Sequence, residues 1–148
     1  MITALLVDDE PKAIDRLAEM LEAFESIDVI GRAQSVAEAE RFLRGRAPDV
    51  VFLDITMPGR LGVDLLGSIP HGTAVVFVTA RDGYAVDAFR SGAVDYVLKP
   101  FDHDRLAITV ERLAQRFAAN EGLGTGEPAA ADLGGDRTKA REISGDEG

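Results

Sequence analysis

Five polar residues of this 148-residue chain stand at the ends of short apolar runs: Asp8, Asp9, Asp54, Thr79 and Lys99. Two carboxylates about 4 Å apart repel each other by roughly 4 kcal/mol at an effective dielectric constant of 20, so three converging acids require a counter-ion. Their oxygens suit Mg²⁺ or Mn²⁺, and without histidine or cysteine ligands zinc is disfavoured. Asp54 could also act as a nucleophile that forms an acyl phosphate. Lys99 would add a cation and Thr79 a hydroxyl, which together predict a site for a phosphoryl group.

The apolar runs that precede these residues predict the strands of a parallel sheet, at residues 4–7, 27–30, 50–53, 75–78 and 94–98. Three of them, ALLV, VVFL and VVFV, are apolar throughout, as expected of strands buried on both faces of such a sheet. Open α/β sheets bind ligands at the carboxyl ends of their strands. In the common strand order 2-1-3-4-5 the first and third strands are neighbours, so Asp8, Asp9 and Asp54 are expected to converge.

Amphipathic segments alternate with the strands and predict helices. Ser35 and Glu38 form a capping box that opens the second helix, and Asp102 can cap the last one. Residues 61–68 and 84–91 are shorter helical segments. The predicted fold class is therefore α/β: a five-stranded parallel sheet, doubly wound as (βα)5, with the flavodoxin-like strand order 2-1-3-4-5.

The composition excludes several classes of protein. Hydrophobic residues make up 46% of the chain and charged residues 28%, which is typical of a globular domain. The net charge of −10 argues against direct nucleic-acid binding, because a phosphate backbone would repel it. The lack of cysteine excludes disulfides and thiolate chemistry. No signal peptide is evident, and the longest uncharged stretch, residues 65–80, is broken by glycine and proline, so we expect a cytoplasmic protein without a membrane span.

The composition changes near residue 120. Residues 121–148 contain seven glycines and only three large aliphatic residues, and their charges sum to −4. This pattern predicts a domain over residues 1–120, followed by a flexible, glycine-rich, acidic linker or tail over residues 121–148.

The segments VDDE, FLDITMPG, VTA and VLKPF, found in this order, resemble the receiver domain of two-component response regulators. The resemblance covers residues 2 to about 118. The segment DGYAVDAFRSGAVDYVLKPFD is most similar to the receivers of the LytTR (AlgR/LytR-like) regulators. The resemblance implies that Asp54 is the phosphorylated aspartate. It also implies that Asp8, Asp9, Asp54 and the backbone carbonyl of Thr56 hold Mg²⁺ or Mn²⁺.

The same resemblance assigns roles to residues on the last two strands. Thr79 and Lys99 would contact the phosphoryl oxygens. Tyr96 would be an aromatic switch residue, turning inward when Thr79 is drawn toward the phosphate. The bond between Lys99 and Pro100 would be a cis peptide.

The function implied is that of a phosphoacceptor that takes a phosphoryl group from a histidine kinase and promotes only its own phosphorylation and dephosphorylation. Its output would be a changed face formed by residues 84–91, the strand at 94–98 and the last helix. That face is expected to form a phosphorylation-promoted homodimer through aromatic residues and charges of both signs: Tyr84, Phe89, Tyr96, Asp87, Arg90, Asp95 and Arg112. The chain could be the N-terminal part of a transcriptional regulator or a stand-alone receiver.

Three other classes of protein remain as alternatives. One is a degenerate receiver that docks proteins without being phosphorylated. A second is a phosphatase of the haloacid dehalogenase type, which would require an acid at position 56, where this chain has Thr56. A third is a flavin or nucleotide carrier, although the acidic VDDEPK loop would repel a phosphate.

Overall fold

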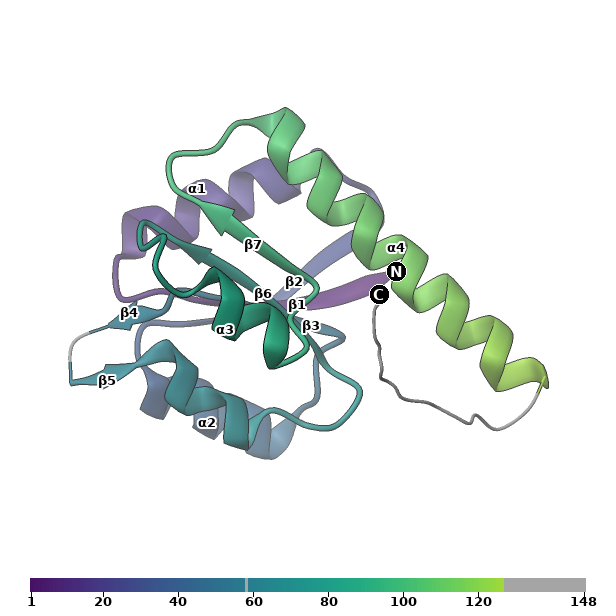
Figure 1. The fold of residues 1–148 in the computed structure, drawn as a ribbon, viewed down its shortest axis with the longest axis horizontal. Coiled ribbons are helices and arrows are strands. Elements are labelled where there is room, and N and C mark those ends of the chain that lie inside the picture. The colour runs from purple at the N-terminus through teal and green to yellow at the C-terminus, as the bar shows by residue number, and fades with distance from the viewer. Residues whose placement is uncertain (58, 127–148) are drawn as a thin grey trace. The chain divides into compact units, whose positions relative to one another are not determined.

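The computed structural model describes residues 1–57 and 59–126 of the chain. Its main sheet has five parallel strands in the order β2-β1-β3-β6-β7 (Figure 1). The strands are β1 (Ile2–Val7), β2 (Ile27–Ala33), β3 (Val50–Leu53), β6 (Ala74–Thr79) and β7 (Asp95–Leu98). Taken in chain order, these are strands 2-1-3-4-5, so the predicted α/β class and strand order are confirmed.

Helices cover both faces of this sheet. They are α1 (Pro11–Leu21), α2 (Val36–Gly45), the 3-10 helix η1 (Gly62–Ser68), α3 (Ala85–Arg90) and α4 (His103–Gly126). In Figure 1, α1 lies on one side of the sheet and α2 on the other. Buried residues of α2, η1 and α3 pack in one cluster with residues of β1, β3 and β6, so these three elements share a face. This arrangement is the predicted doubly wound one.

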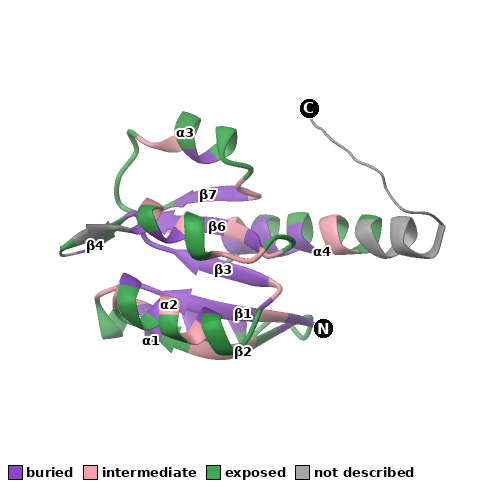
Figure 2. Cartoon of the chain, turned by 90° about the horizontal axis from the view of Figure 1, so that it is seen from below, coloured by how far each residue is buried: buried purple, intermediate pink, exposed green. Residues whose placement is uncertain are grey.

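The sheet forms the core because its central strands carry almost no polar residues. All four residues of β3 are buried, and Figure 2 shows β1, β3 and β6 as largely buried strands. The predicted helix caps are present: the Ser35 hydroxyl accepts a hydrogen bond from the N–H of Glu38 at 3.0 Å. Likewise, the carboxylate of Asp102 accepts one from the N–H of Arg105 at 2.9 Å. Both helix caps predicted from the sequence are therefore present in the structure.

Three features differ from the expectations. The strands extend one to three residues beyond the predicted 4–7, 27–30 and 75–78, and the segment after Asp54 forms a small hairpin, β4 (Thr56–Met57) with β5 (Arg60–Leu61). Residues 62–68 form a 3-10 helix rather than an α-helix.

At the end of the described chain, α4 continues to Gly126 and includes six residues of the predicted linker or tail. Residues 1–113 form one compact unit, and a second unit begins at Ala114 within α4. The rest of the predicted linker, residues 127–148, lies outside the described residues, so the boundary at residue 120 stays a prediction. Within residues 1–57 and 59–126, no helix combines the length and apolarity needed to cross a bilayer.

Candidate functional site

The predicted site residues are fixed by the sheet itself. Asp8, Asp54 and Lys99 each come directly after a strand, and their backbone N–H groups continue the hydrogen bonding of the sheet by one residue. Each donates to a carbonyl group of a neighbouring strand: Asp8 to Ala33 (3.1 Å), Asp54 to Val7 (3.0 Å) and Lys99 to Thr79 (2.8 Å). The backbones of these three residues are therefore as constrained as the strands that precede them.

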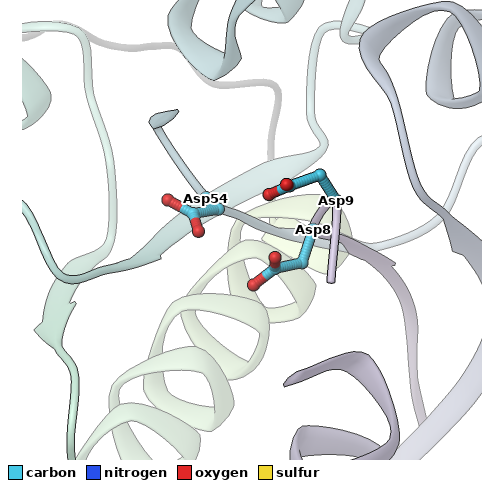
Figure 3. A group of neighbouring side chains, drawn as sticks. All are labelled: Asp8, Asp9 and Asp54. Atoms are coloured by element: carbon cyan, nitrogen blue, oxygen red, sulfur yellow. The ribbon is translucent and has the colours of Figure 1, made fainter. Parts of the chain in front are cut away.

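Asp8, Asp9 and Asp54 converge at this edge of the sheet (Figure 3). One carboxylate oxygen from each lies within 4.8 Å of the others, and the three residues form a group that could hold a metal ion. Asp8 and Asp54 are buried, whereas Asp9 is half-buried. The convergence predicted from the strand order is confirmed.

Lys99 is the cation bound to this acidic cluster. Its ammonium lies 2.6 Å from an oxygen of Asp8 and 3.1 Å from an oxygen of Asp54. Burial alone would lower the pKa of Lys99, but the hydrogen bonds and charges of Asp8 and Asp54 outweigh it and raise that pKa. Burial raises the pKa of Asp8 despite the hydrogen bond to Lys99. Burial therefore disfavours the charged form of Asp8 even beside Lys99, and a group of three carboxylates with one ammonium is suited to a divalent cation.

Backbone hydrogen bonds orient two of the carboxylates. An oxygen of Asp54 accepts from the N–H of Thr56 at 3.1 Å, and an oxygen of Asp8 accepts from the N–H of Glu10 at 3.0 Å. The loop after Asp54 returns closely to it at Gly62, where a Cβ atom would lie 1.9 Å from the carbonyl oxygen of Asp54. A residue with a side chain at position 62 would displace the backbone at the candidate phosphoacceptor.

Thr79, Arg81 and Tyr96 form a connected group beside the acids. The buried Thr79 hydroxyl accepts a hydrogen bond from the N–H of Arg81 at 3.2 Å, and the phenol of Tyr96 donates to the carbonyl oxygen of Arg81. The guanidinium of Arg81 donates to the hydroxyl of Thr56 at 3.4 Å and lies over the ring of Tyr84. Tyr96 is only 8% exposed, and burial raises its pKa. Its ring is therefore in the inward position in this structure.

The peptide bond between Lys99 and Pro100 is cis, as the family resemblance implied. Thr56, the predicted source of a carbonyl ligand, is the first residue of β4 and is exposed. Its role as a metal ligand stays a prediction.

A second charged cluster joins β7 to α4. Sequence reasoning named some of its residues but did not predict that they contact one another. Asp95 is 1% exposed and accepts hydrogen bonds from two arginines and a threonine of α4. The distances are 2.8 and 2.9 Å to Arg105, 2.8 Å to Arg112 and 2.7 Å to Thr109. These partners outweigh burial and lower the pKa of Asp95.

The expectation that Asp95 and Tyr96 lie on a dimerisation surface is therefore wrong. Both side chains are buried, Asp95 against arginines of its own chain and Tyr96 against the segment after β6. Sequence reasoning placed Asp95 on the right strand. It could not predict that the Asp95 side chain points into the protein, because a charged residue is almost never fully buried unless it is paired.

Comparisons with known proteins agree with this geometry. Residues 4–111 match the family of the response regulator receiver domain. The chain is 48% identical over 123 residues to an uncharacterised response regulatory protein of Vibrio cholerae, covering 82% of this chain and 52% of that protein. It is 41% identical over 117 residues to the transcriptional regulatory protein BtsR of Escherichia coli, covering 78% and 49%.

Solved receiver structures have the same architecture. The response regulatory domain of mrkE from Klebsiella pneumoniae aligns with a TM-score of 0.73 at 28% identity, covering 80% of this chain and 99% of that one. The receiver domain of AraT from Geobacillus stearothermophilus aligns with a TM-score of 0.72 at 29% identity, covering 81% and 98%.

The chain belongs to the response regulator receiver domain family. It is a receiver domain of the response regulator type, and it spans about half the length of the curated relatives it matches.

Proposed function

We propose that this domain accepts a phosphoryl group on Asp54. The observation that carries the proposal is the position of Asp54, which has one carboxylate oxygen on the ammonium of Lys99 and the other on the N–H of Thr56. The side chain is thereby fixed at the edge of the sheet, beside Asp8 and Asp9. Such positioning supplies a large part of the catalysis of phosphoryl transfer.

Asp8, Asp9, Asp54 and the backbone carbonyl of Thr56 would hold Mg²⁺ or Mn²⁺. Hard oxygen donors around an under-compensated negative charge fit such an ion, which usually keeps several water ligands. When bound, the ion neutralises charge on the transferring phosphoryl group. The protein positions its own groups for the same purpose, because the Lys99 ammonium and the Thr79 hydroxyl can both contact phosphoryl oxygens.

The donor would be a phosphohistidine of a sensor histidine kinase. A carboxylate oxygen of Asp54 attacks the phosphorus, so that an O–P bond forms and the P–N bond breaks. The imidazole leaves with the electron pair of the broken bond, and the product on Asp54 is an acyl phosphate. The domain would promote only its own phosphorylation and dephosphorylation.

The decisive experiment is labelling with a small-molecule phosphodonor and Mg²⁺, followed by intact mass spectrometry. We expect one acid-stable, base-labile phosphate in the wild type and none in Asp54→Asn. Asp64→Asn is the matched control, because Asp64 is exposed on η1 outside the acidic group. Equal labelling of Asp54→Asn would refute the assignment, and an unlabelled wild type that still bound a partner would favour the docking-module alternative.

The output surface would be formed by α3, β7 and the first turns of α4. Each contributes an exposed apolar residue: Phe89 is 51% exposed, Leu98 44% and Ile108 46%. Apolar side chains of this size favour burial against a second molecule, so we retain the phosphorylation-promoted homodimer as a proposal. Sedimentation velocity with and without beryllofluoride would test it, and an unchanged monomer would contradict it.

The relatives suggest a wider role. BtsR is named a transcriptional regulatory protein, and this chain matches about half of it. We therefore propose that the domain acts within a LytTR-like transcriptional regulator in the cytoplasm. In that arrangement, DNA binding would lie outside this chain.

A further inference from the structure

We propose that a cavity between α1 and the sheet is a binding site for a small aromatic molecule. The cavity has a volume of about 190 Å³ and lies next to the acidic cluster. Its walls come from α1, from β1, β3 and β6, and from the segment Lys99–Phe101 that follows β7. All of these elements belong to the compact unit of residues 1–113.

The lining of the cavity is mostly apolar. Buried Ile14 and Leu17 of α1 face it, as does buried Phe52 of β3, and Phe101 lines it from the loop. An apolar cavity of about 150 Å³ is known to remain dry and to take up benzene. At about 190 Å³, this cavity has room for a ring of that size or slightly larger.

One charged residue of the wall favours an aromatic over an aliphatic ligand. Arg16 lines the cavity from an exposed position on α1, and a guanidinium is attracted to the face of an aromatic ring, whereas the Lys99 ammonium is already held by Asp8 and Asp54. Phe52 and Phe101 also line the cavity, and pairs of aromatic rings gain from offset or edge-to-face contacts. An aliphatic ligand would gain only from burial.

An occupant would also affect the acidic cluster. Lys99 lines the cavity while its ammonium binds Asp8 at 2.6 Å, and Asp8 lines the cavity as well. A ring in this position takes up space beside Asp8 that water would otherwise fill, and Mg²⁺ usually keeps several water ligands. The ligand should therefore weaken Mg²⁺ binding. This second part rests on the metal site proposed above.

The test is titration of indole into the isotopically labelled chain, followed by two-dimensional NMR without metal or phosphodonor. We expect saturable chemical-shift changes confined to cavity residues such as Ala13, Leu17 and Phe52. The variant Ala13→Leu, which fills the cavity from α1, should abolish them. The matched control Ala37→Leu makes the same change at an exposed position of α2 and should leave them intact.

Two outcomes would overturn the site. One is the absence of saturable changes in the wild type. The other is changes at exposed residues such as Phe89 in place of the cavity lining. Because this readout needs neither Mg²⁺ nor phosphorylation, its failure is distinguishable from failure of the proposed function.

The coupling is measured separately, by Mg²⁺ titration with and without saturating indole. We expect saturating indole to lower the affinity for Mg²⁺ about fivefold, which is at the lower end of typical coupling between two sites. Because such coupling is reciprocal, Mg²⁺ should weaken indole binding by the same factor. An unchanged Mg²⁺ affinity would refute the coupling.

Discussion

Asp8 and Asp95 are both buried carboxylates of one sheet, but their surroundings are opposite. Asp8 shares a single ammonium with Asp54 and lies beside Asp9. Asp95 accepts hydrogen bonds from two guanidinium groups and a hydroxyl. The pKa of Asp8 is raised and that of Asp95 is lowered, so the charged form is disfavoured at the first position and favoured at the second.

The opposite pKa shifts of Asp8 and Asp95 distinguish a buried charge that binds a ligand from one that stabilises the fold. The cluster around Asp95 is internally satisfied and joins β7 to α4, as expected of a structural ion pair. The cluster around Asp8 is left with excess negative charge, which is the condition under which a cation or a phosphoryl group can add stability. The following predictions test this division.

Removing Asp95 should have the largest effect. In Asp95→Ala the guanidinium of Arg105 loses its buried partner. Loss of one member of a buried ion pair costs about 3–5 kcal/mol, and we expect about 3 kcal/mol here because the Arg105 side chain is 32% exposed. Urea denaturation measures the change. Asp15→Ala is the control, because Asp15 pairs with Arg32 at 2.6 Å in an exposed setting, where a pair contributes about 0–1 kcal/mol. Equal losses in the two variants would contradict the structural role of Asp95.

Mg²⁺ should stabilise the domain through the other cluster. A ligand present at 100 times its dissociation constant adds about 2.7 kcal/mol by mass action. Thermal unfolding with and without Mg²⁺ should show this gain in the wild type and in Asp64→Ala, but not in Asp9→Ala. If Asp9→Ala keeps the full response, the proposed ligand set is wrong.

Gly62 should be needed for the position of Asp54. The Cβ of Gly62→Ala would meet the Asp54 carbonyl at 1.9 Å, and overpacking of this kind costs about 1–3 kcal/mol. Labelling of Asp54 should slow as well, because its backbone must shift. Gly67→Ala is the control, since a Cβ at Gly67 meets nothing within 4 Å. Wild-type stability and labelling rate in Gly62→Ala would exclude this positioning role.

Neutralising Asp8 should have the smallest effect and the opposite sign. Because the pKa of Asp8 is raised by folding, its contribution to stability is present below the unfolded value of 3.8 and is lost as the pH rises through the folded value. Asp8→Asn cannot ionise, so it should gain about 0.5–2 kcal/mol over the wild type at neutral pH. The gain should vanish on acidification, and denaturation at pH 3 and pH 7 checks both points. A loss of stability at pH 7 would mean that Lys99 fully compensates Asp8.

The main sheet could be predicted because its three central strands contain the apolar runs ALLV, VVFL and VVFV, each followed by a polar residue. The convergence of Asp8, Asp9 and Asp54 followed from the strand order alone. The β4–β5 hairpin was not predictable, because each of its strands has two residues and leaves no pattern. The 3-10 helix was expected as an α-helix, since a seven-residue segment carries too little periodicity to distinguish them.

The cluster around Asp95 did leave a signal that could have been used. Its partners on α4 are Arg105, Thr109 and Arg112, at spacings of four and three residues, so they share one helical face. They border the apolar face of Leu106 and Leu113, both of which are buried. Polar residues that flank an apolar face can reach inward to a strand. Their target could not be identified without the packing of α4 on β7.

The one-residue extension of the sheet at Asp8, Asp54 and Lys99 has a consequence for hydrogen exchange. Their amides should exchange only when the sheet itself opens, although each residue stands at the start of a loop. Loop positions that contact none of the reacting groups, unlike Thr56 and Gly62, are then free to change without moving those groups. Such changes would alter what the domain contacts, while the reacting groups stay attached to the sheet.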